Sequence, residues 1–135
     1  MGIGGLINKL TGKAVFTPVF DCGSCLNPML EDEDLAKIDD AEMKNLAVNC
    51  HSCLRVDGKR INYFNFIMGL SNDECNNVLI RVMNKIDMYQ IDCFIDNIDC
   101  ISLVRKEFYK RIIKYRYSIL ERIYAKLKPR NKIGR

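Results

Sequence analysis

Two cysteine pairs constrain the fold of this chain more than any other feature of its sequence. Cys22 and Cys25 form the first pair, Cys50 and Cys53 form the second, and each has the spacing C-x-x-C. A C-x-x-C turn points two thiolates at one ion, so two such turns can close a tetrahedral four-cysteine site. The doubled pattern predicts a structural zinc ion bound by these four side chains.

Three other uses of the cysteines compete with zinc. Redox-active pairs are disfavoured because neither pair lies between a strand and a helix of a βαβ unit. A disulfide framework is disfavoured because the chain has an odd number of cysteines, seven, and no signal peptide is expected at its start. An iron–sulfur centre would use the same ligands, and this alternative stays open. These features favour a reducing, intracellular compartment, the cytoplasm or the nucleus.

The sequence offers little material for catalysis. Four thiolates would leave zinc no open position for a reacting water. His51, the only histidine, is followed by Ser52 and Cys53, so the H-x-E motif of the zinc deaminases is absent. No G-x-x-x-x-G-K-[ST] phosphate-binding loop is present. We therefore expect a protein that is not an enzyme and that has no small-molecule substrate.

Short strand patterns surround the cysteine pairs. Residues 19–21 and the segment from Leu26 onward read as strands on either side of the first pair, and Asp57-Gly58 predicts a hairpin turn after the second pair. The acidic run 31–34 is expected to be a solvated loop or the start of a helix, where carboxylates suit the helix dipole. This half of the chain is predicted to be a zinc-ribbon-like module.

Apolar residues recur at helical spacing in the second half of the chain. Ser71 and Glu74 form a capping box, and the pattern predicts helices near 72–88, 91–98 and 101–128. The expected fold class is α+β, with the ribbon-like module followed by a helical part that ends in a long basic amphipathic helix. The expected divisions are an N-terminal arm, the ribbon-like module, the helical part and a basic tail, at residues 1–16, 17–62, 63–128 and 129–135.

The basic charge is concentrated in the last quarter of the chain. The net charge is +4, but residues 101–135 hold 12 of the basic and only 2 of the acidic side chains. A concentration of one sign of charge indicates an anionic partner such as nucleic acid, a membrane surface or an acidic protein. The candidate binding surface consists of Lys106, Lys110, Arg111, Lys114, Arg116, Arg122, Lys126, Lys128 and Arg130.

Tyrosines are interleaved with these basic residues. Basic side chains contact phosphates and tyrosines stack on bases, so the long helix could bind nucleic acid. The competing interpretation is an ordinary solvated helix face with tyrosines in the core. We expect a zinc-stabilised, non-enzymatic binding protein, with a nucleic-acid-associated regulator as the first hypothesis. The alternative is an adaptor or inhibitor that binds a partner protein, and peripheral membrane attachment is a weaker third hypothesis.

Overall fold

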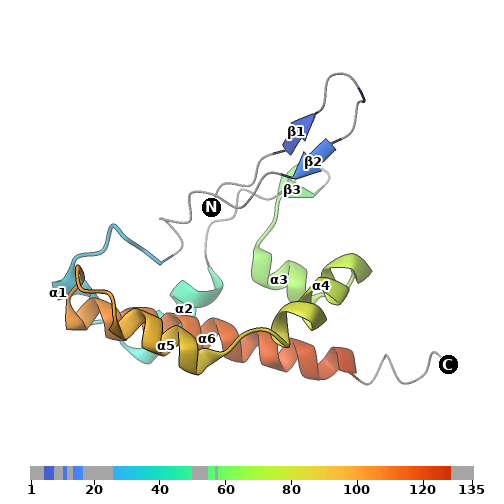
Figure 1. Cartoon of the computed structure of the whole chain (residues 1–135). Coiled ribbons are helices and arrows are strands. Elements are labelled where there is room, and N and C mark those ends of the chain that lie inside the picture. The colour runs from blue at the N-terminus through green and yellow to red at the C-terminus, as the bar shows by residue number, and fades with distance from the viewer. Residues whose placement is uncertain are drawn as a thin grey trace.

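The computed structural model describes residues 5–7, 11, 14–16, 26–49, 55–56 and 58–128. This part of the chain is mostly helical (Figure 1). Its helices are α1 (Asp32–Leu35), α2 (Asp40–Val48), α3 (Tyr63–Met68), α4 (Asp73–Met83), α5 (Met88–Asp96) and α6 (Leu103–Leu127). Its strands are β1 (Gly5–Ile7), β2 (Ala14–Phe16), β3 (Arg55–Val56) and β4 (Lys59–Arg60).

Helix α6 is the element on which the other helices pack. It has 25 residues, so at 1.5 Å per residue it is roughly 37 Å long. The Ser102 hydroxyl caps its start by accepting a hydrogen bond from the backbone N–H of Arg105 at 3.1 Å. Helices α1, α2, α4 and α5 all contact it, and Figure 1 shows it running along the base of the molecule. The predicted long helix is therefore confirmed.

Two buried clusters lie along α6. The first contains Leu35, Ile38, Met43, Ala47, Phe108 and Ile112. The second contains Leu79, Met83, Ile119, Ile123 and Leu127. In each cluster the apolar stripe of α6 meets the apolar faces of shorter helices. A large aliphatic or aromatic side chain contributes about 1.5–3 kcal/mol when it is fully buried, so these clusters hold the helices together.

Side-chain caps fix where the shorter helices begin. The Asp39 carboxylate accepts a hydrogen bond from the Glu42 backbone N–H at 2.8 Å and so caps α2. Helix α4 is capped by Asn72, whose side-chain oxygen accepts from the Cys75 N–H at 2.8 Å. The sequence pattern placed this cap one residue earlier, at Ser71, because serine and asparagine are almost equally good N-caps.

The strands form two separate antiparallel hairpins. Strands β3 and β4 pair Arg55 with Arg60, and Gly58 adopts the positive φ of 76° that the predicted hairpin turn requires. Strands β1 and β2 pair Leu6 with Val15. The sequence interpretation missed this second hairpin and expected only an N-terminal arm.

The expected α+β fold with a zinc-ribbon-like module is wrong. The described residues are mostly helical, and their strands form only the two short hairpins. Residues 26–30, expected to start a strand, form turns that lead into α1. Leu35, Ile38 and Met43 are buried against α6, and this burial favours the short helices α1 and α2 over strands. Cys22, Cys25, Cys50, His51 and Cys53 lie outside the described residues.

Candidate functional site

Several basic side chains of α6 make contacts within the protein. The Lys106 ammonium donates to the backbone carbonyl oxygen of Asp96 at 2.7 Å. The Lys110 ammonium lies 2.5 Å from the Asp96 carboxylate and 3.6 Å from that of Glu107. The hydrogen bond to Asp96 raises the pKa of Lys110. These two lysines therefore tie the end of α5 to α6.

Arg105 fastens α1 and the preceding turn to the first turns of α6. Its guanidinium lies 2.9 Å from the Asp32 carboxylate and donates to the Leu30 carbonyl oxygen at 2.6 Å. Hydrogen bonding from the Ser102 hydroxyl, and then from Arg105, lowers the pKa of Asp32. Hydrogen bonding to Tyr109, and then to Asp32, raises the pKa of Arg105. Arg105 faces α1 because its ion-pair partner, Asp32, belongs to that helix.

The other basic residues of the predicted surface differ in their environments. Arg111 donates to the Ile38 carbonyl oxygen and to the Asp40 carboxylate, both at 3.2 Å, and so fixes the start of α2. The ammonium of Lys128 lies 4.8 Å from the centre of the Tyr124 ring. Lys114, Arg122 and Lys126 are exposed, Arg116 is half-buried, and Arg130 lies outside the described residues.

The tyrosines of α6 belong to the core rather than to an open stacking surface. Tyr109 and Tyr115 pack against the first buried cluster, and Tyr117 and Tyr124 pack against the second. Burial raises the pKa of Tyr115 and Tyr117. The Tyr124 hydroxyl also donates to the side-chain oxygen of Asn84 at 2.9 Å. These contacts match the competing interpretation of core tyrosines behind a charged helix face.

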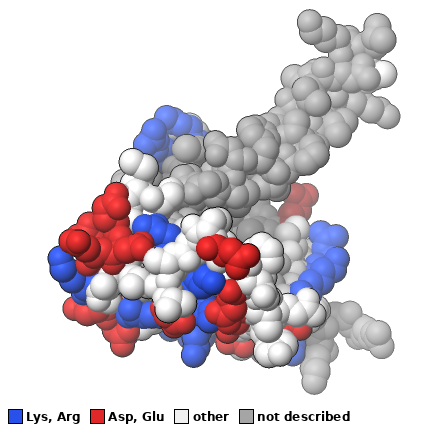
Figure 2. Space-filling model, turned by 60° about the vertical axis from the view of Figure 1, so that its left-hand side comes forward, with Lys and Arg blue, Asp and Glu red and all other residues white. Residues whose placement is uncertain are grey.

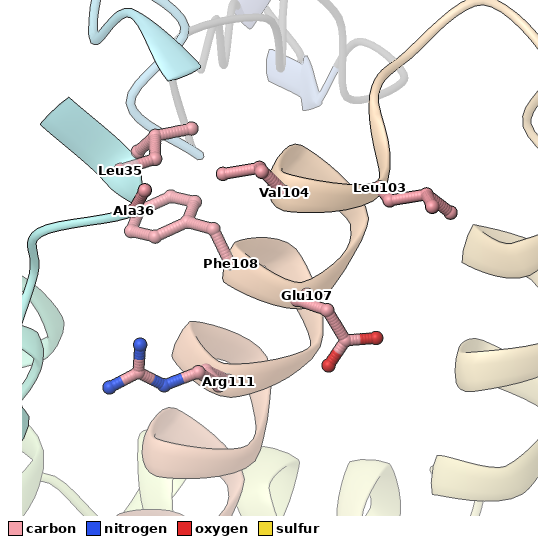
Figure 3. A pocket seen from close by; sticks show the side chains of 7 residues that line it. All are labelled: Leu35, Ala36, Leu103, Val104, Glu107, Phe108 and Arg111. Carbon is pink, nitrogen blue, oxygen red and sulfur yellow. The ribbon is translucent and has the colours of Figure 1, made fainter. Parts of the chain in front are cut away.

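A groove opens between α1 and the first turns of α6, and we refer to it as the α1/α6 groove. Its volume is about 340 Å³, and its lining consists of Leu35, Ala36, Leu103, Val104, Glu107, Phe108 and Arg111 (Figure 3). In Figure 3, Phe108 of α6 lies beside Leu35 and Ala36. A mostly apolar lining with one carboxylate and one guanidinium suits the binding of a side chain from another molecule.

Apolar residues at the start of α6 remain exposed along this groove. Leu103 has 78% of its surface accessible and Val104 has 38%. Val104 is four residues before Phe108 and eight before Ile112, so helical spacing alone indicates burial for it, whereas Leu103 lies off this line. The sequence signal for Leu103 was a leucine directly after the helix cap and off the apolar line. Single exposed leucines are common on protein surfaces, so this signal could not show that Leu103 lines a groove.

The four-cysteine zinc site stays a prediction because its ligands lie outside the described residues. Among the residues that the structure does describe, no group of three or more His, Cys, Asp or Glu side chains could hold a metal ion. Cys75 and Cys93 are half-buried and Cys100 is exposed, although the seven-residue spacing of Cys93 and Cys100 predicts a shared, buried helix face for these two. None of the described helices combines the length and apolar character needed to cross a membrane.

Comparison with known proteins relates the chain to a bacterial protein kinase. It is 37% identical over 108 residues to the serine/threonine-protein kinase CtkA of Helicobacter pylori strain J99. This match covers 75% of the chain and 32% of that kinase. The structure resembles the crystal structure of a Helicobacter pylori proinflammatory kinase CtkA, with a TM-score of 0.80 and 31% sequence identity. The structural match covers 94% of the chain and 46% of the solved chain.

The chain thus spans about a third of the curated relative and slightly less than half of the solved structure. No family model matches it. The sequence and structural similarities agree on one protein, and that protein is an enzyme. The predictions of a non-enzyme and of a zinc-stabilised nucleic-acid binder are therefore wrong. The non-enzyme prediction rested on missing catalytic motifs, and the nucleic-acid prediction rested on the basic charge of the last quarter of the chain.

Proposed function

We propose that this chain forms the helical part of a serine/threonine-protein kinase similar to CtkA. The observation that carries the proposal is the agreement between two similarities, one in sequence over 108 residues and one in fold over 94% of the chain. Sequence identity at this level over a folded region supports a related role for the region. The nucleic-acid partner and the adaptor role have no comparable support.

The described helices are suited to a supporting role in such a kinase. Phosphoryl transfer depends on holding ATP, its metal ions and the acceptor hydroxyl in line, and the protein contributes mainly positioning and electrostatic stabilisation. Two buried clusters along α6, with ion pairs from Arg105, Lys110 and Arg111 to neighbouring segments, make a rigid body of this kind. The partner in this proposal is a protein that presents a serine or threonine hydroxyl.

A chimeric kinase tests the proposal. The segment of CtkA that matches this chain is replaced by the chain itself, and transfer of the γ-phosphoryl group of radiolabelled ATP to a protein substrate is measured, with phosphoamino-acid analysis of the product. The expected result is phosphoserine or phosphothreonine, produced above the level of CtkA lacking the segment. A chimera that folds but forms no phosphoamino acid would contradict the proposal.

A matched pair of variants shows whether activity depends on the helical body. Ile112 is fully buried in the first cluster, and Ile112→Asp would place a charge among apolar side chains. Tyr89 is 77% exposed on α5, so Tyr89→Asp leaves the core intact. The first substitution is expected to abolish the activity of the chimera, and the second is expected to leave it unchanged.

A further inference from the structure

The α1/α6 groove has the shape and lining of a site for an apolar side chain. Its volume of about 340 Å³ falls at the lower end of the range for ligand pockets. Phe108 and Leu35 are each 2% exposed and form its buried part, whereas Leu103 and Val104 stand exposed along it. Leu103 leaves 78% of its surface in water, so an occupant that covers it would remove apolar area from solvent.

The α1 side of this groove carries uncompensated negative charge. Glu31, Glu33 and Asp34 are exposed, and none of the described residues forms an ion pair or hydrogen bond with their side chains. They lie within one helical turn of Leu35, which lines the groove. Asp32, by contrast, is paired with Arg105.

Of the two charged residues in the lining, the acidic one is the more available to a ligand. Glu107 contributes a carboxylate with 69% of its side chain exposed, and its one ion-pair partner among the described residues is Lys110, at 3.6 Å. The guanidinium of Arg111 is held by Asp40 and by the carbonyl oxygen of Ile38. Lys37 is the single basic residue among positions 31–37. Figure 2 turns the α1 end of the molecule forward and shows clusters of acidic side chains there, with basic side chains between them.

We propose that the α1/α6 groove docks a short peptide segment in which a large apolar side chain is flanked by Lys or Arg. This inference rests on the proposed function, because the segment would belong to a protein that the kinase phosphorylates. The apolar side chain would enter between Leu103, Val104 and Phe108. The flanking cations would meet the carboxylates of α1 and of Glu107, and such charge complementarity favours correct orientation and fast association.

Fluorescence anisotropy with the full chain tests the proposal. The probe is a short fluorescein-labelled peptide with two leucines between Lys-Arg pairs, and the matched control peptide has Glu at the basic positions. The basic peptide is expected to bind with a Kd on the order of tens of micromolar, and the acidic peptide at least about tenfold more weakly. Added salt should weaken binding of the basic peptide, because it screens the exposed charges.

Two sets of variants separate the apolar and acidic contributions. Leu103→Ala with Val104→Ala should weaken binding about tenfold, and alanine is a good helix former that adds no charge, so α6 should still form. Tyr89→Asp, exposed but outside the groove, is the control and should have no effect. Neutralising Glu31, Glu33 and Asp34 as amides should weaken binding several-fold, whereas Asp73→Asn with Glu74→Gln, at the start of α4, should not.

Several results would overturn the docking site. No binding of the basic peptide up to about 1 mM, equal binding of the acidic peptide, or no effect of the groove variants would each overturn the docking site. A dimer in solution that the Leu103 and Val104 variants dissociate would assign the groove to a second copy of the chain, and would also overturn it. If the chimeric kinase is active but the peptide does not bind, only the docking inference fails. If the peptide binds but the chimera is inactive, the proposed function fails.

Discussion

Phe108→Ala should strongly destabilise the helical body, because Phe108 joins α1 and α2 to α6. Its side chain is 2% exposed and belongs to the first buried cluster, with Leu35, Met43 and Ile112 among its members. Truncation of a buried phenylalanine costs about 3–5 kcal/mol through lost transfer free energy and the cavity left behind. Phe108 also lines the α1/α6 groove, so the new space would open to solvent. We therefore expect the lower end of that range, about 3 kcal/mol.

Such a loss is a large share of the stability of an ordinary domain, about 5–15 kcal/mol. The free energy of unfolding would be measured by urea denaturation, followed by the circular dichroism of the helices. Ile123→Ala, in the second cluster, is the matched buried control and should cost about 2–5 kcal/mol. Tyr89→Ala on the surface should change stability by less than about 0.5 kcal/mol. A Phe108→Ala cost below about 1 kcal/mol would refute the packing described for α1, α2 and α6.

Two further predictions concern single carboxylates. Asp39→Ala removes the cap of α2 and should lower the free energy of unfolding by about 0.5–2 kcal/mol in urea denaturation; an unchanged value would show that the cap is not formed. The pKa of Asp32, followed by NMR, should lie below that of an ordinary aspartate. Its contribution to stability is then present above its unfolded pKa and is lost as pH falls through the folded pKa. A normal or raised pKa would contradict the contacts with Ser102 and Arg105.

The second half of the fold was predictable because its sequence carries strong local signals. The stripe that includes Phe108, Ile112, Ile119 and Ile123 predicts α6 to within a few residues, and no glycine or proline interrupts it. The Asp57-Gly58 turn likewise predicts the hairpin of β3 and β4. In both cases the residues that set the local structure lie close together in the chain.

The strand expected from Leu26 onward was predicted wrongly because tertiary contacts decide the structure of this segment. Helix α1 has only four residues and forms where Leu35 packs on α6 and Asp32 meets Arg105. These partners lie about 70 residues away in sequence, so periodicity cannot show them. The α1/α6 groove was missed for the same reason, since its two walls come from distant segments.

The basic residues illustrate why charge composition did not identify a binding surface. Lys106, Lys110 and Arg111 were expected to face an anionic partner, yet they contact carbonyl and carboxylate oxygens of this protein. The sequence shows that these charges lie on one helix but does not show which acidic segments pack beside it. Asp40 and Asp96, from two other helices, are the partners that only the fold brings near.

The initial rate of phosphoryl transfer by the CtkA chimera tests the central claim most directly. The claim is that this chain can stand in for the matched part of a serine/threonine kinase. The account predicts phosphorylation of serine or threonine at a rate within about a hundredfold of CtkA itself, which corresponds to about 2.7 kcal/mol in activation free energy. A chimera with intact helical circular dichroism and no phosphoryl transfer above that of CtkA lacking the segment would contradict it.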